Sequence, residues 1–175
     1  EGVGAAAEAR AEAEARPRAR GKHRMDAETC TILQNAMRAE SKSFLQYVSD
    51  AFPWTTSDEL TALPKLQSLI AEEQEGAGAI AEFLTQRKQP LPYLGSYPMS
   101  FTTMNFVSLE HLLPILAKEE RRAIADRERD LANLKDAEAQ SVLRRVVDMK
   151  RRHLQLLQAA SAAYPETHST VPSRA

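Results

Sequence analysis

The stretch LIAEEQEGAGAIAEFL, residues 69–84, looks like an amphipathic helix with one misplaced charge. Its apolar side chains recur at alternating gaps of three and four from Ile70 to Leu84, which is the spacing of one helix face. Between Ile70 and Ala77 that series has Glu73. A carboxylate in a buried stripe is costly unless another group compensates it. The stretch therefore predicts a helix whose buried face meets compensating groups on its neighbours.

The composition of the 175-residue chain favours a single all-α domain. Strong helix formers dominate, and there are only 6 glycines. The net charge of −1 gives no global field that would favour nucleic acid or an anionic membrane. No apolar run approaches the ~20 residues that span a bilayer. The single cysteine, Cys30, excludes an internal disulfide framework, and we predict a cytoplasmic protein.

Both ends of the chain differ from its body. Residues 1–24 contain no Leu, Ile, Phe, Tyr or Trp and carry a basic run from Arg16 to Arg24. We expect a disordered arm there, or non-native sequence upstream of a true start at Met25. The only partner expected for this arm is nucleic acid, which its basic run could bind weakly. Residues 165–175 are predicted to be an unstructured tail, which leaves residues 25–164 for the folded domain.

Four long helical patterns fill that domain. The first runs from Asp26, a plausible N-cap, to about residue 51, and the second from Ser57 to about residue 88. The third is predicted over about 105–134, with Pro114 as a kink, and the fourth over about 136–163.

The linker between the second and third patterns, residues 89–104, is long. Sixteen extended residues reach ~50 Å, and a thirty-residue helix is ~45 Å long. The other two connections are short, so each joins an antiparallel pair. We predict a four-helix up-down bundle of two hairpins joined by a long crossover. The crossover is expected to pack on the helices through its apolar side chains, which are Leu91, Tyr93, Leu94, Tyr97, Met99 and Phe101.

Each helix pattern has one charged residue at the centre of its apolar stripe. These are Glu40, Glu73, Glu120 and Lys150, with His153 one turn further along the fourth helix. Each lies about fourteen to sixteen residues after its predicted helix start, so all four fall at one level of the bundle. Two arrangements can compensate the charges: two metal ions bridged by carboxylates, or a metal-free network in which Lys150 donates to the three glutamates.

The four helices, the long second crossover and the central acids resemble the ferritin-like superfamily of rubrerythrins and bacterioferritins over residues 25–163. That family carries one Glu on helices one and three, and Glu-x-x-His on helices two and four. Glu40 and Glu120 match the single acids. In EQEG, Glu73 matches the acid and Gly76 replaces the histidine. In KRRH, His153 matches the histidine and Lys150 replaces the acid.

The resemblance implies a metal site formed by Glu40, Glu73, Glu120 and His153, holding iron or manganese, with Lys150 as a counter-charge where a second ion would bind. It implies a metal-handling or oxidative-stress protein whose di-metal site is partly lost. The alternative is a metal-free binding or scaffold protein. We expect no catalysis; an iron or manganese oxidoreductase of the rubrerythrin type is the other interpretation.

Other residues have plainer interpretations. Cys30 is expected to be a small buried side chain, and His111 to lie on the surface. Tyr47 is predicted to be a core aromatic whose hydroxyl can reach the polar cluster. We predict a dimer, with no membrane partner, in which a second subunit packs on the crossover residues Tyr93, Leu94, Tyr97 and Phe101.

Overall fold

The computed structural model describes residues 25–51, 53, 55 and 62–163, and this part of the chain contains helices and no β-strand. The predicted all-α class is therefore confirmed. The elements are α2 (Ala27–Ser41), α3 (Phe44–Ala51), α4 (Leu63–Gln86), the 3-10 helix η2 (Met99–Met104), α5 (Leu109–Asn133) and α6 (Ala137–Ala163). The expectations for residues 1–24, Ser57 and residues 165–175 lie outside the described residues.

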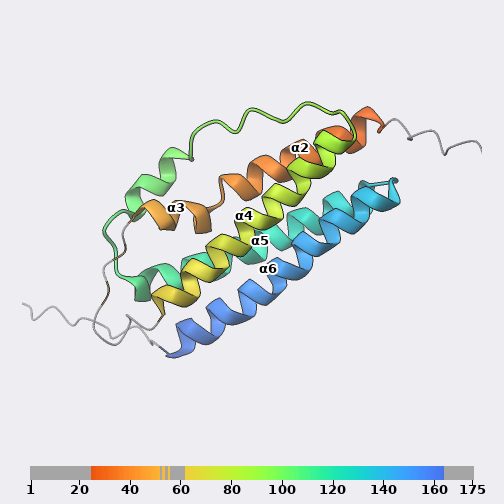
Figure 1. Cartoon of the computed structure of the whole chain (residues 1–175). Coiled ribbons are helices and arrows are strands. Elements are labelled where there is room, and N and C mark those ends of the chain that lie inside the picture. Colours follow the sequence, from red (N-terminus) through yellow and green to blue (C-terminus); the bar gives the residue numbers. More distant parts are fainter. Residues whose placement is uncertain (1–24, 52, 54, 56–61, 164–175) are drawn as a thin grey trace, which may run out of the picture.

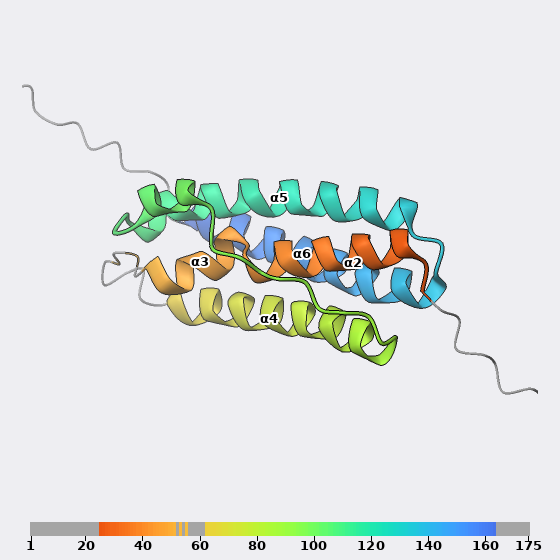
Figure 2. The same cartoon turned by 90° about the horizontal axis from the view of Figure 1, so that it is seen from above.

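The helices lie side by side along one long axis (Figure 1). Helices α2 and α3 follow one another and together make one rod of the bundle, and α4 runs back beside them. The chain then returns along α2 without regular structure, reaches η2 and enters α5 (Figure 2). Helices α4 and α5 consequently run in the same direction, and α6 runs back against both.

Side-chain caps fix the starts of α2 and α5. Asp26 accepts hydrogen bonds from the backbone N–H and the hydroxyl of Thr29, at 2.8 and 2.9 Å, as its N-cap role predicts. Ser108 caps α5 by accepting from the N–H of His111. This cap starts the helix at Leu109, so the predicted start near Asn105 is wrong.

The first predicted helix is broken, which corrects the continuous helix expected from Asp26 to residue 51. Helix α2 ends at Ser41, and Ser43 starts α3 by accepting a 3.0 Å hydrogen bond from the N–H of Gln46. A serine hydroxyl that binds the backbone locally competes with the helical ladder, which is the physical reason for the break.

The second helix also ends earlier than residue 88. Lys88 adopts a left-handed conformation with φ of 56°, and the N–H of Gln89 turns back to the carbonyl of Leu84 at 2.9 Å. These bonds close α4 at Gln86 in the manner of a Schellman motif. Helix α5 continues through Pro114.

The crossover is held mainly by its backbone and by one aromatic cluster. Gln34 and Arg38 of α2 donate to the carbonyl oxygens of Pro90 and Tyr93, at 2.7 and 3.0 Å. Further along, Phe101 of η2 packs edge-on against Phe44, with ring centroids 5.0 Å apart. The crossover thus lies along the helices as predicted.

Half of its apolar side chains do not pack, contrary to expectation. Leu91, Tyr93 and Met99 are 51%, 88% and 81% exposed. Leu94, Tyr97 and Phe101 are half-buried on the helices. Of the residues predicted to face a second subunit, only Tyr93 is largely exposed, and the dimer stays a prediction.

The core forms two apolar clusters, one towards each end of the bundle. One contains Leu33, Ile80 and Leu143, and the other contains Leu45, Leu69 and Leu112. The layer between them holds the buried charged residues. None of the helices in the described part of the chain has the length and apolar character of a membrane span.

The two glycines of α4 give a matched test of its packing. At Gly78 an added Cβ would meet nothing within 4 Å, so Gly78→Ala should raise the free energy of unfolding by about 0.5–1 kcal/mol through helix propensity. At Gly76 the Cβ would lie 3.3 Å from Sδ of Met149, so Gly76→Ala should raise the free energy of unfolding by less than Gly78→Ala does. Urea unfolding of both variants measures this difference, and equal gains would contradict a tight contact at Gly76.

Candidate functional site

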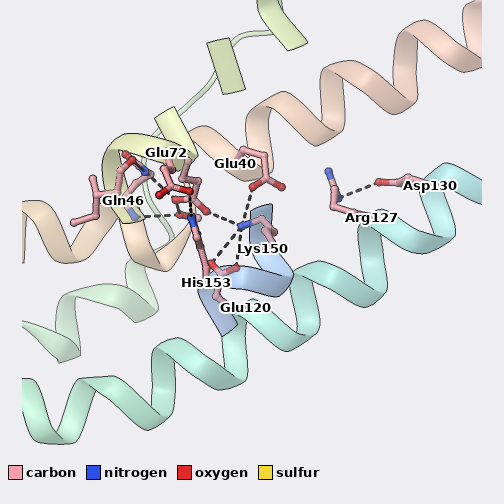
Figure 3. A network of polar contacts seen from close by, with 11 residues as sticks. Glu40, Gln46, Glu72, Glu120, Arg127, Asp130, Lys150 and His153 are labelled. Atoms are coloured by element: carbon pink, nitrogen blue, oxygen red, sulfur yellow. Dashed lines mark hydrogen bonds and ion pairs between the residues drawn. The ribbon is translucent and has the colours of Figure 1, made fainter. Parts of the chain in front are cut away.

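The amine of Lys150 lies at the centre of the buried charged layer. Its Nζ is 2.6 Å from Oε1 of Glu73, 2.8 Å from Oε2 of Glu40, and 3.3 and 3.4 Å from the two oxygens of Glu120. The four side chains are at most 3% exposed. They come from α6, α4, α2 and α5 in that order, so each rod of the bundle contributes one group (Figure 3). The convergence predicted from the stripes is therefore present.

Glu73 has a second set of partners that the sequence did not reveal. Its Oε2 accepts hydrogen bonds from the hydroxyl of Ser43 at 2.6 Å and from the amide of Gln46 at 2.8 Å. The Gln46 amide also donates to the carbonyl of Ile70. The Lys150 ammonium and these two neutral donors thus bind the two oxygens of one buried carboxylate, as charge burial requires.

The break between α2 and α3 supplies those two donors. Ser43 is the N-cap of α3 and Gln46 is three residues further on, so the segment SFLQ carries the sequence signature of a capping box. This pattern was the one sign in the sequence that a helix starts at Ser43. Here the glutamine side chain turns across to Glu73 instead of back to the cap.

The cluster holds more acid than base, and burial changes how its carboxyls titrate. Desolvation raises the pKa of Glu40, against the opposing attraction of Lys150. Desolvation likewise raises the pKa of Glu120 from 4.5 to about 7. Burial alone would lower the pKa of Lys150, but the three nearby glutamates outweigh it and raise that pKa. The ammonium therefore stays charged near neutral pH, and Glu120 can gain or lose a proton there.

His153, the fourth predicted metal ligand, contacts Glu72 and makes no hydrogen bond to Glu40, Glu73 or Glu120. Its Nε2 lies 3.3 Å from Oε2 of Glu72, a residue at the edge of the α4 stripe that also pairs with Arg152 at 3.4 Å. Burial lowers the pKa of His153. The ring is fully buried, and its Nδ1 has no hydrogen-bond partner among the described residues.

The donor set as arranged does not fit two metal ions. The Lys150 ammonium already contacts Glu40, Glu73 and Glu120, and His153 binds Glu72. Gly76 offers no ligand, and the thioether of Met149 lies against it. Within residues 25–51 and 62–163, no group of three or more His, Cys, Asp or Glu is arranged to hold a metal ion. Binding of a single iron or manganese ion by Glu40, Glu73, Glu120 and His153 stays a prediction.

A cavity of about 230 Å³ leads from the surface to the cluster, between the α2–α3 rod and α5. Its acidic lining residues are Glu40, Glu119, Glu120 and Asp126. Its basic lining residues are Lys42, Arg122, Arg127 and Lys150. Glu40, Glu120 and Lys150 form the inner end of this cavity, although each is at most 3% exposed.

Arg127 belongs to this cavity but not to the Lys150 cluster. It is 7% exposed and pairs with Asp130 through Nη2 at 3.1 Å (Figure 3). Its Nε and Nη1 have no hydrogen-bond partner among the described residues. Buried donors without partners are rare in folded proteins and call for an explanation.

The remaining predicted residues take structural positions. Cys30 is half-buried against the core, and burial raises the pKa of its thiol. His111 is exposed, as predicted. The Tyr47 ring joins the aromatic cluster, but its hydroxyl donates to Asn105 at 2.5 Å and does not reach the carboxylates.

The chain was compared with models of protein families, with curated proteins and with solved structures, and none of the three comparisons gives a match. The site is therefore interpreted from its own geometry.

The raised pKa of Glu120 makes stability depend on pH in a defined direction. Between pH 4.5 and about 7 the folded protein keeps a proton that the unfolded chain has lost. This contribution is complete below pH 4.5 and is lost as the pH rises through 7. Glu120→Gln cannot titrate, so its stability relative to the parent should rise between pH 5 and pH 8, by up to about 3 kcal/mol.

Urea unfolding of both proteins at pH 5, 6, 7 and 8 measures this difference. Glu138→Gln, at a side chain that is 74% exposed, controls for the loss of one carboxylate charge. A difference between Glu120→Gln and the parent that does not change with pH would contradict the assignment.

Proposed function

We propose that this chain is a ferritin-like bundle that works without a metal, as a binding or scaffold protein, with Lys150 as the permanent cation of its central site. The observation that carries the proposal is the position of the Lys150 ammonium, 2.6–3.4 Å from carboxylate oxygens on three other helices. A metal ion that bridged the same three glutamates would have to occupy the position of this ammonium.

The path of the chain supports a relationship to the ferritin-like superfamily. Two antiparallel helix pairs are joined by a connection that returns along the bundle, which is the connectivity of ferritin-like folds (Figure 2). The buried charges lie about midway along each rod, between the two apolar clusters of the core, where that superfamily binds its metals.

The chemistry of Lys150 argues against catalysis by this residue. A lysine serves as nucleophile or general base only when it is neutral near pH 7, which requires a lowered pKa. Here the three carboxylates raise it. The lysine can compensate charge and hold neighbouring groups in place, and it has no redox chemistry of its own.

One observation favours the alternative of a metal-handling protein. Three buried carboxylates face one ammonium, so the cluster attracts a further cation. Under this alternative Lys150 moves aside, and iron or manganese binds Glu40, Glu73 and Glu120.

Elemental analysis distinguishes these alternatives. Protein purified without chelators should contain far less than one iron or manganese ion per chain, and adding Mn²⁺ should leave its melting temperature unchanged. Lys150→Glu restores an acid three residues before His153, and this variant should gain Mn²⁺-dependent stabilisation. Lys150→Met, which removes the charge without adding a ligand oxygen, is the matched control.

Stoichiometric metal in the parent protein would contradict the proposal. So would Mn²⁺ stabilising the parent as much as it stabilises Lys150→Glu.

A further inference from the structure

We propose that the cavity between the α2–α3 rod and α5 binds a small zwitterion, with the ligand's ammonium on Glu40 and Glu120 and its carboxylate on Arg127. This assignment rests on the proposed metal-free function, because it needs the three carboxylates to be free of metal. It names the class of ligand that the binding protein would take.

The cavity has the size of a metabolite site for a small molecule. Its volume of about 230 Å³ corresponds to the liquid volume of about eight waters. It is open to solvent at one side, and its inner wall is formed by Glu40, Glu120 and Lys150. These charges are at most 3% exposed, so a solute has to shift the side chains that cover them, and electrostatic interactions are strong in that poorly hydrated setting.

Arg127 supplies the first half of the recognition. Its guanidinium is almost fully buried, and Nη2 is engaged by Asp130. The Nε and Nη1 hydrogens have no acceptor among the described residues. A buried guanidinium with unfilled donors favours a carboxylate or another strong acceptor from outside the chain.

Glu40 and Glu120 supply the second half. Oε2 of Glu40 lies 2.8 Å from the Lys150 ammonium as an ion pair and has no other partner among the described residues. One ammonium cannot neutralise Glu40, Glu73 and Glu120 together. Burial raises the pKa of Glu120 and the neighbouring Glu73 and Glu40 raise it further, so a second ammonium would favour the ionised carboxylate.

Glu40, Glu120 and Arg127 line one cavity, and Arg127 does not contact either carboxylate. No ion pair joins Arg127 to Glu40 or Glu120 in the described part of the chain, and Figure 3 shows Arg127 displaced from Lys150 along α5. Seven residues separate Glu120 from Arg127, which is about 10 Å along the helix axis. A molecule that bridges them needs a positive and a negative end some distance apart.

A ligand of one charge fits less well. A small anion on Arg127 would leave the acidic residues around Lys150 without a further cation. A simple cation at Glu40 would leave the Arg127 donors unfilled. The charged lining as a whole is balanced, with four acidic and four basic residues, which suits a molecule that carries both signs.

The experiment uses a series of zwitterions of increasing length: glycine, 4-aminobutanoate and 6-aminohexanoate, each added to the full chain after its metal content has been measured. Isothermal titration calorimetry gives the affinity. One member of the series should bind at least about tenfold more tightly than butanoate and butylamine, which carry only one of the two charges. In buffers of different ionisation enthalpy at pH 7, binding should release protons, because the ligand's ammonium favours ionised Glu120.

Glu120→Gln and Arg127→Gln should each weaken that binding by about tenfold or more. Arg129→Gln, at an exposed position on the same helix, is the control and should bind like the parent. Circular dichroism melts check that each variant folds. If a variant does not fold, the comparison of the zwitterions with butanoate and butylamine on the parent still decides the question.

The inference is overturned if no member of the series binds at millimolar concentration, or if butanoate or butylamine binds as well as the zwitterions. If the protein contains no metal, either result contradicts only the proposed ligand and is compatible with the proposed function. Metal in the purified protein removes the proposed function itself.

Discussion

An ammonium group among three carboxylates, inside a helical bundle, is the interaction on which the rest of this structure depends. Each of these charges would cost several kcal/mol if it were buried alone. Together they tie α2, α4, α5 and α6 at one level, and the two apolar clusters of the core pack on either side of that level. Because the polar groups must meet, they also fix the register of the helices against each other, which apolar packing alone specifies weakly.

The fold could be predicted from periodicity because nearly every stripe residue has the burial expected of it. Leu33, Ile80 and Leu143 are fully buried, and so is Glu73, whose helical phase placed it there. The convergence with Lys150 followed from equal distances to the helix starts, an argument that needs only the rise per residue. Length and phase are local properties, and the sequence records them directly.

The predictions that were wrong concern residues whose positions depend on contacts between distant segments of the chain. Ser43 breaks the first helix because its hydroxyl has two uses at once, capping α3 and donating to Glu73, 30 residues away. His153 lies one turn from Lys150, but its imidazole contacts Glu72 at the edge of the α4 stripe and not the carboxylates around Lys150. The predicted packing of Tyr93 failed because hydrophobicity cannot say which face of an extended crossover is turned to solvent.

The same cluster connects stability to function. Burial, reinforced by the neighbouring Glu73 and Glu40, leaves Glu120 with a pKa of about 7, and a cavity open to solvent at one side lies beside it. The site therefore keeps an affinity for positive charge from outside. Arg127, buried in the same cavity with unfilled donors, limits which positively charged molecules fit.

The most direct test of the account is the free energy of unfolding of Lys150→Met at pH 8 and at pH 5, with Lys135→Met, at a side chain that is 83% exposed, as the control. If the ammonium compensates the buried glutamates, Lys150→Met loses about 3–5 kcal/mol at pH 8. It should recover part of that loss at pH 5, where the acids can take up protons. A Lys150→Met variant as stable as the parent at both pH values would contradict the central claim.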